Sequence, residues 1–279
     1  MAYTRLLADL QINTDLARTI LIGFIRDEIN RVGFERAVIA LSGGVDSSLV
    51  AYLIVEALGA ENVLGVRMPY KTSAADSSDH AGLVIDALKI ADETIGITAM
   101  VEPLIERFPK MNPVRTGNIM ARQRMVVIYD RSADWGGLVV GTSNKTETLL
   151  GYTTQFGDNA AAIQPIADLY KNQVRQLARA MGVPQEIIDK APSADLWPGQ
   201  TDEGELGYTY DDVDQLLYWM VDKRHNLKEA VAAGFDKELV ENVWKRVRQT
   251  HYKRHMPVIA KLSQRTVGYD FLYMRDWGT

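Results

Sequence analysis

The sequence predicts an α/β protein: a single domain of residues 1–279 with a doubly wound parallel sheet and helices on both faces. Two observations support this prediction. Short apolar runs, of the kind found in buried strands, alternate along the chain with longer stretches of helical spacing. The first apolar run also leads into a glycine turn that opens a helix, as at the start of a strand–helix–strand unit.

Each expected element follows from its local pattern. The strand candidates are residues 37–41, 63–68, 95–101 and 138–141. The helix candidates are residues 14–31, 46–58, 74–91, 118–133 and 169–181, with N-caps expected at residues 13–14 and at Asp168. The first of these helices has apolar residues in two adjacent rows, a wider face than one contact with a sheet needs, which predicts a homodimer. Residues from about 208 to 279 are expected to form a helical segment that completes the site.

The turn after the first strand candidate, SGGVDS at residues 42–47, predicts an anion site. The first N–H groups of a helix lack intrahelical partners, and the helix dipole favours negative charge there. This turn lacks the lysine of a Walker loop and carries Asp46 instead, which indicates Mg²⁺ held beside phosphates. The alternative interpretation is an ordinary strand–turn–helix in which Asp46 or Ser47 caps the helix.

A second acid follows the last strand candidate, in GTSNKTE at residues 141–147. Glu147 is predicted to share Mg²⁺ with Asp46 through bridging phosphate oxygens. Taken alone, an acid such as Glu147 is more often a solvated residue at a helix start, where the dipole favours it, and the pairing with Asp46 is what supports the metal role. Lys171 falls in the first turn of another expected helix, where a cation is unfavourable unless a polyphosphate supplies the counter-charge. Its alternative is a harmless surface lysine.

Three further segments are singled out. Residues 191–207 are rich in proline, glycine and acids, lack any period, and are interpreted as an active-site lid, with a plain surface loop as the alternative. Arg122 lies in a helical row with apolar residues, where it either holds a substrate anion or extends its stem along the apolar face. The basic run at residues 251–255 has a solvated tail as its simplest interpretation, and the four histidines show no metal-ligand spacing.

Composition limits the possible functions. The formal net charge is −5, which argues against a nucleic-acid binder, and no apolar run is long enough to span a bilayer. The first residues lack the apolar core of a signal peptide, so a cytoplasmic protein is expected. Cysteine is absent, which excludes disulfides, cysteine-ligated zinc and a cysteine nucleophile.

Taken together, these segments resemble the ammonia-dependent NAD synthetases, a family of the ATP pyrophosphatase (PP-loop) superfamily. The resemblance is carried by residues 42–47, 67–70, 141–147, 151–152, 157–158, 192–196, 201–203 and 205–207. It implies an enzyme that amidates deamido-NAD with ammonia, splits ATP into AMP and pyrophosphate through an acyl-adenylate, and uses Mg²⁺. It also implies a homodimer whose dinucleotide site draws on both subunits.

The resemblance also implies roles for individual residues. The metal ligands would be Asp46 and Glu147. ATP would be bound by Leu41, Ser42, Gly43, Gly44, Val45, Asp46, Ser47, Arg67, Met68, Thr142, Lys171 and Ser193. Deamido-NAD would be bound by Arg122, Gln155, Asp158, Glu205, Tyr252 and Lys253. The catalytic set would be Asp46, Glu147, Lys171, Asp158 and Glu205.

Two positions depart from the family pattern, and two other functions compete with it. Gln155 stands where many relatives have lysine, and Ala162 where many have aspartate; both map to the dinucleotide side.

One rival function is a tRNA-modifying ATP pyrophosphatase, which the acidic composition and the missing cysteine disfavour. The other is a nucleotide-binding protein without catalysis, which would not need the paired acids Asp46 and Glu147.

Overall fold

The computed structural model describes residues 8–193, 195–196 and 199–271. The strands are β1 (Ala37–Ala40), β2 (Val63–Arg67), β3 (Ala91–Thr94) and β4 (Leu138–Val140). The helices up to the end of the sheet are α2 (Thr14–Arg31), α3 (Val45–Leu58), α4 (Ala75–Leu88), α5 (Thr98–Arg107) and α6 (Pro113–Trp135). Those that follow are α7 (Lys145–Leu150), α8 (Lys171–Ala180), α9 (Gln185–Asp189), α10 (Asp202–Leu206), α11 (Tyr210–Leu217), α12 (Leu227–Ala232) and α13 (Lys237–Gln249). Short helical turns are η1 (Ala60–Asn62), η2 (Tyr218–Asp222) and η3 (His251–Arg254).

The four strands form one parallel sheet in the order β3-β2-β1-β4. Ala37 of β1 lies opposite Val63 of β2 on one side and opposite Leu138 of β4 on the other. The chain therefore builds outward from β1 to β3 and then returns through α6 to place β4 on the free side of β1. This reversal creates a switch point between the ends of β1 and β4, where ligands bind in open α/β sheets.

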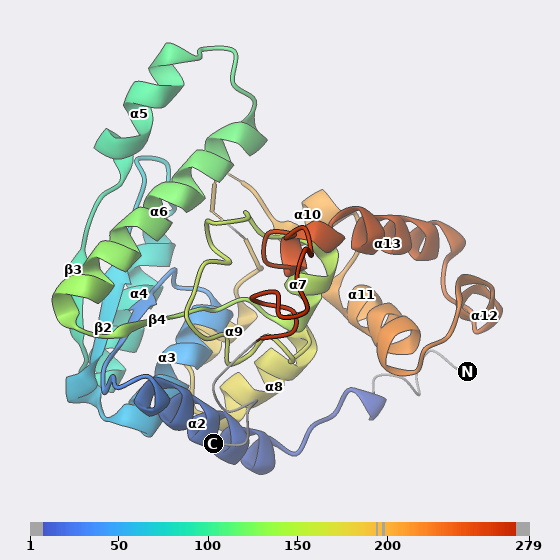
Figure 1. The fold of residues 1–279 in the computed structure, drawn as a ribbon, viewed down its shortest axis with the longest axis horizontal. Coiled ribbons are helices and arrows are strands. Elements are labelled where there is room, and N and C mark those ends of the chain that lie inside the picture. The colour runs from blue at the N-terminus through green and yellow to red at the C-terminus, as the bar shows by residue number, and fades with distance from the viewer. Residues whose placement is uncertain (1–7, 194, 197–198, 272–279) are drawn as a thin grey trace.

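Both faces of the sheet are covered, as the alternation of side chains along each strand requires. Ile39 points into a core shared with α2, α3 and α8, whereas Val38 and Val139 point into a core beneath α5 and α6. Figure 1 shows these helices on opposite sides of the strands. The fold class predicted from the sequence is confirmed.

The C-terminal helices α11, α12 and α13 gather beside the sheet rather than on it (Figure 1). They have a core of their own, into which Leu216 and Val240 are buried. Leu150 of α7 and Tyr170, which precedes α8, belong to the same core. This packing attaches the C-terminal segment to the two helices that follow the switch point.

The third strand was predicted in the wrong place. Residues 95–101 were expected to form it, but the strand is β3, and α5 begins at Thr98. β3 is an edge strand whose polar side chains are paired from neighbouring elements: Asp92 contacts Arg67 at 2.5 Å. The apolar pair that suggested a strand, Ile97 and Val101, is spaced four residues apart and is buried as one helical face.

The start of α8 was also predicted wrongly. The N-cap is Tyr170 and not Asp168, and the helix begins at Lys171. The backbone N–H of Tyr170 donates to Gln173 Oε1 at 3.0 Å, so the helix is capped two residues later than expected. Asp168 instead pairs with Lys145 over 3.1 Å.

Two other boundaries differ from expectation. α6 is longer than residues 118–133, because Asn112 caps it and a proline occupies its first position. Residues 191–207 are not wholly irregular: Thr201 caps the short helix α10, while residues 194 and 197–198 of this expected lid lie outside the described part. No described helix is long and apolar enough to cross a membrane.

Candidate active site

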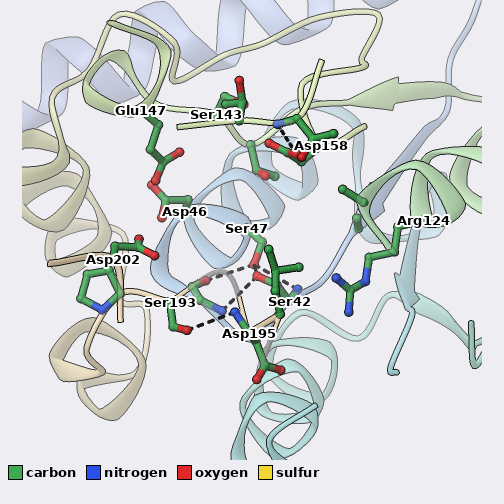
Figure 2. A pocket seen from close by; sticks show the side chains of 18 of the residues that line it. Ser42, Asp46, Ser47, Arg124, Ser143, Glu147, Asp158, Ser193, Asp195 and Asp202 are labelled. Carbon is green, nitrogen blue, oxygen red and sulfur yellow. Dashed lines mark hydrogen bonds between the residues drawn. The ribbon is translucent and has the colours of Figure 1, made fainter. Parts of the chain in front are cut away.

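A cavity of about 920 Å³ opens at the switch point, beyond the carboxyl ends of the strands. Its walls come from the turns after β1 and β4, from α6, from the start of α8, and from the segment between α9 and α10. Figure 2 shows the acids Asp46, Glu147 and Asp202 at one end of this cavity and Arg124 at the other. This size suits a nucleotide, within the range of ordinary ligand sites.

The turn after β1 is held rigidly at the start of α3. Gly44 is the N-cap, and the Ser47 hydroxyl donates to its carbonyl at 3.1 Å. The backbone N–H of Ser42 donates to Ser47 Oγ at 3.3 Å. Gly43 has a φ of +74°, and a Cβ there would lie 2.2 Å from the carbonyl oxygen of Ser77, so only glycine fits. The result is a preformed loop at a helix N-terminus, which favours an anionic ligand.

Three charged side chains from three helices meet beside this loop. Lys171 Nζ donates to Asp46 Oδ2 and, over 3.3 Å, to Glu147 Oε1. Asn144 fixes both acids, since its Nδ2 donates to Asp46 Oδ1 at 2.9 Å and its Oδ1 accepts from the backbone N–H of Glu147 at 2.9 Å. Figure 2 shows the two carboxylates pointing toward each other.

Burial governs the charges in this cluster. It raises the pKa of Glu147; Lys171 lowers that pKa, and the neighbouring Asp46 charge raises it again. Burial acts to lower the pKa of Lys171, but the charges of Asp46 and Glu147 outweigh it and raise that pKa. Lys171, only 2% exposed, therefore keeps its proton and supplies a positive charge between the two acids.

The first residue of α8 is anchored from α7 and α11. The backbone N–H of Lys171 donates to Thr146 Oγ1 at 3.0 Å. The Thr146 hydroxyl in turn donates to Asp214, which also accepts from the backbone N–H of Asn172 at 2.8 Å. Burial raises the pKa of Asp214 to about 6. This buried network places Lys171 at the edge of the cavity.

Asp158 and Glu205 approach the cavity from different segments. Asp158 Oδ1 accepts from the backbone N–H of Thr154 at 2.8 Å, and burial raises its pKa. Glu205 of α10 accepts from the Tyr152 hydroxyl at 2.7 Å and from Gln200 Nε2 at 2.9 Å. Both carboxylates line the cavity and can accept a proton from a ligand there.

Lys253 of η3 holds the turn between these acids. Its Nζ donates to the carbonyls of Gly151 at 2.8 Å and Thr153 at 2.6 Å. Burial lowers the pKa of Lys253, and the Asp158 charge partly opposes this effect. The C-terminal segment thus contributes a side chain that lines the cavity.

Most of the residues predicted for the site line this cavity: Leu41, Ser42, Gly44, Val45, Asp46, Ser47, Arg67, Met68, Thr142, Glu147, Asp158, Lys171, Ser193, Glu205 and Lys253. Four predicted residues do not line it: Gly43, Arg122, Gln155 and Tyr252. Gly43 acts on the shape of the loop through its positive φ and its close approach to the Ser77 carbonyl. The other three lie outward, and the Arg122 guanidinium donates to the Gln155 carbonyl at 3.2 Å.

Sequence reasoning missed two residues that line the cavity, Arg124 and Asp202, and one that supports its acids, Asn144. Arg124 follows Arg122 by two residues on α6, and its Nε donates to the Met68 carbonyl at 3.1 Å. Asn144 sits inside the GTSNKTE segment, where its spacing from Glu147 was a recognisable capping signal. Asp202 sits in an acidic run that reads as a solvated surface, and only its burial at 4% exposure singles it out.

A glycine loop at a strand end, a paired-acid cation centre and a nucleotide-sized cavity on a parallel sheet together define an enzyme of the PP-loop fold. A family profile described as NAD synthase matches residues 18–257. The chain belongs to the NAD synthase family and is an enzyme of the ligase class.

Individual relatives agree with this assignment. The NH(3)-dependent NAD(+) synthetase of Trichlorobacter lovleyi is 56% identical over 96% of this chain and 98% of its own length. The enzyme of the same name from Fusobacterium nucleatum is 48% identical over 91% of this chain and 99% of its own. Among solved structures, the NMN synthetase from Francisella tularensis matches with a TM-score of 0.80 and 31% identity over 90% of this chain and 100% of that one.

Proposed function

We propose that this enzyme uses ATP and ammonia to amidate deamido-NAD, yielding NAD, AMP and pyrophosphate. The observation that carries the proposal is the meeting of the SGGVDS loop with Asp46, Glu147 and Lys171 at one end of a nucleotide-sized cavity. The names of the curated relatives point to the same reaction.

The first step activates the nicotinate carboxylate of deamido-NAD. One carboxylate oxygen attacks the α-phosphorus of ATP, an O–P bond forms, and the bond to the β-phosphate oxygen breaks to release pyrophosphate. The N–H groups at the start of α3 and the Lys171 ammonium stabilise the charge that develops on the leaving group. Because the N–H groups at the start of α3 are held in place before the substrate arrives, little backbone reorganisation is needed during the reaction.

Asp46 and Glu147 are the proposed ligands of Mg²⁺. Among the described residues, no three His, Cys, Asp or Glu side chains gather to hold a metal, so phosphate and water oxygens would have to complete the shell. Such a mixed set is what Mg²⁺ usually takes, and the Lys171 ammonium already occupies a cation position between the two acids. When bound, the metal would neutralise phosphate charge.

The second step forms the amide. Ammonia attacks the activated carbonyl, AMP leaves, and the nitrogen loses a proton. Ammonium has no lone pair, so a nearby carboxylate must first accept a proton from it. Asp158 and Glu205 are the candidates: both line the cavity, and burial raises the pKa of Asp158, which favours proton acceptance.

We also propose that the enzyme works as a homodimer. Arg122, assigned to the dinucleotide, lies on α6 in the same exposed row as Val126 and Tyr129, which are 54% and 41% exposed. An apolar face of this kind marks an interaction surface. A second copy seated there would enclose Arg122 and complete the dinucleotide half of the site. A separate exposed apolar row on α2, with Ile20 at 59%, is the competing face.

The test is incubation of the purified chain with ATP, Mg²⁺, deamido-NAD and ammonium, with AMP, pyrophosphate and NAD quantified together. We expect equal amounts of the three products, faster turnover as the pH rises toward the pKa of ammonium, and none with glutamine alone. A parallel reaction with the nicotinate mononucleotide tests the activity named for the Francisella tularensis relative. Efficient use of glutamine, or AMP release without NAD, would contradict the proposal.

A further inference from the structure

Lys171 stands where the metal ion is expected. Its ammonium bonds to Asp46 and lies 3.3 Å from Glu147 Oε1, between the two acids proposed as Mg²⁺ ligands. A divalent cation and an ammonium group repel each other as like charges and cannot occupy one position between the same carboxylates. The lysine must therefore move when the metal enters, and its charge needs an acceptor elsewhere.

Asp202 is a buried acid at the same end of the cavity that the proposed reaction does not use. Its Oδ2 accepts from the Tyr210 hydroxyl at 2.9 Å, whereas its Oδ1 is buried without a hydrogen-bond partner. The Tyr152 hydroxyl lies close enough to lower the pKa of Asp202, but its single proton is donated to Glu205 at 2.7 Å. Figure 2 shows its carboxylate near the facing carboxylates of Asp46 and Glu147. A buried carboxylate oxygen without a donor is costly, so it implies a donor that arrives in another state of the enzyme.

Tyr210 links this acid to the lysine. Its ring centroid lies 5.2 Å from Lys171 Nζ, while its hydroxyl holds Asp202. The Lys171 ammonium therefore already lies against the Tyr210 ring, and the hydroxyl of the same ring donates to Asp202. The charges of Lys171 and Asp202 also interact, since Lys171 lowers the pKa of Asp202 against the larger effect of burial.

The backbones of Lys171 and Asp202 are each held by a hydrogen bond, so the proposed movement of the ammonium involves side chains alone. The N–H of Lys171 donates to Thr146 Oγ1 at 3.0 Å. The N–H of Asp202 donates to the Pro192 carbonyl at 2.9 Å, which ties the first residue of α10 to the segment that follows α9. An ammonium seated on Asp202 would therefore also tie this segment to the occupied site.

We propose that Lys171 fills the cation position between Asp46 and Glu147 in the empty enzyme, and that Asp202 accepts its ammonium once a divalent cation takes that position. This inference rests on the proposed metal site. Asp202 is then a positioning residue. It acts through Lys171, because its carboxylate binds the displaced ammonium beside the phosphates. In the absence of metal, the lysine in turn supplies a cation to these two half-buried acids.

The experiment is a double-mutant cycle on binding of Mn²⁺ alone, without nucleotide, followed by the electron paramagnetic resonance of free Mn²⁺ at one fixed pH. We expect Lys171→Met to bind Mn²⁺ about tenfold more tightly than the wild type, because the competing cation is gone. We expect Asp202→Asn to bind it about tenfold more weakly, and to have no effect in the Lys171→Met background. Should Lys171→Met fail to fold, Lys171→Gln retains a donor for the acids and replaces it.

Equal weakening by Asp202→Asn in both backgrounds would overturn the inference, because Asp202 would then act on the metal directly or on the fold. Unchanged affinity in Lys171→Met would overturn it as well. Asp46→Asn is the control for the underlying site: if it leaves Mn²⁺ binding unaltered, the proposed metal site itself is wrong. That outcome differs from a cycle in which Asp46 matters and Asp202 does not.

Discussion

The two ends of the site differ in how completely one chain builds them. At the cation end, Asp46, Glu147 and Lys171 come from three helices and are held by one another and by Asn144. At the end proposed for the dinucleotide, Arg122 and Tyr252 lie outside the cavity, and Tyr252 is 59% exposed. A buried polar group without a hydrogen bond costs free energy, whereas an exposed one bonds to water and stays available to a ligand or a second subunit. We therefore expect damage to the first end to act on chemistry, and damage to the second to act on substrate binding and assembly.

The largest effect is expected at the cation end. Asp46→Asn keeps the shape and the hydrogen bond from Asn144 but removes a charge from the proposed metal site. AMP formation should fall by more than about a hundredfold, beyond the loss typical of residues that only support metal ligands. Asp168→Asn, which alters the ion pair with Lys145, is the matched control and should leave the rate within about twofold, as surface pairs contribute little. Near-normal activity of Asp46→Asn at ordinary Mg²⁺ would refute the assignment.

The buried support beneath this end should be visible in stability. The pKa of Asp214 is raised to about 6 by burial, so the folded state favours its protonated form, and its contribution to stability is lost as the pH rises. Between pH 4.5 and 7 this loss amounts to about 2 kcal/mol in the free energy of unfolding. Urea unfolding of Asp214→Asn should show a correspondingly smaller fall over that range, whereas exposed Asp211→Asn should follow the wild type. Parallel pH profiles for all three would contradict this prediction.

The dinucleotide end is tested through assembly. Val126→Glu places a charge in the exposed apolar row of α6 and should shift the protein toward monomer in light scattering. If the partner completes the site, KM for deamido-NAD should rise about tenfold while ATP binding is retained, a loss of about 1.4 kcal/mol. Val231→Glu on α12, 40% exposed and remote from this row, is the control. Dissociation by Ile20→Glu instead would transfer the interface to α2, and a wild-type monomer at micromolar concentration would refute the dimer altogether.

The smallest expected effect concerns the segment between α9 and α10. Asp195 accepts from the backbone N–H of Ala74 at 3.1 Å, and Leu196 N–H donates to Gln200 Oε1 at 2.7 Å, so the described part has few anchors. Hydrogen exchange there should slow severalfold on addition of ATP and deamido-NAD, while that of the α3 interior should not change. Equal exchange with and without ligands would rule out the lid. Water would otherwise hydrolyse the activated intermediate, which is the reason to expect closure.

Local sequence patterns predicted the positions of β1, β2 and β4 well, but they missed the edge strand β3. β1, β2 and β4 lie within a residue or two of their predicted ranges, because buried parallel strands are continuous apolar runs. β3 was missed because an edge strand is solvated and its acids are paired with arginines from other elements. The cap of α8 was misplaced because Asp168 is drawn to Lys145, a contact that no local pattern records.

The sequence alone determined the sheet class, the loop that joins β1 to α3, the segments that carry Asp46 and Glu147, and the family, because each of these depends on residues that lie close together along the chain. The homodimer and the cytoplasmic location remain predictions. Only the tertiary structure decided that Lys171 lies between Asp46 and Glu147, that Asn144 holds both acids, and that Asp202 is buried. Asp46 and Lys171 alone are 125 positions apart, so such contacts depend on strand order and helix packing, which periodicity does not encode.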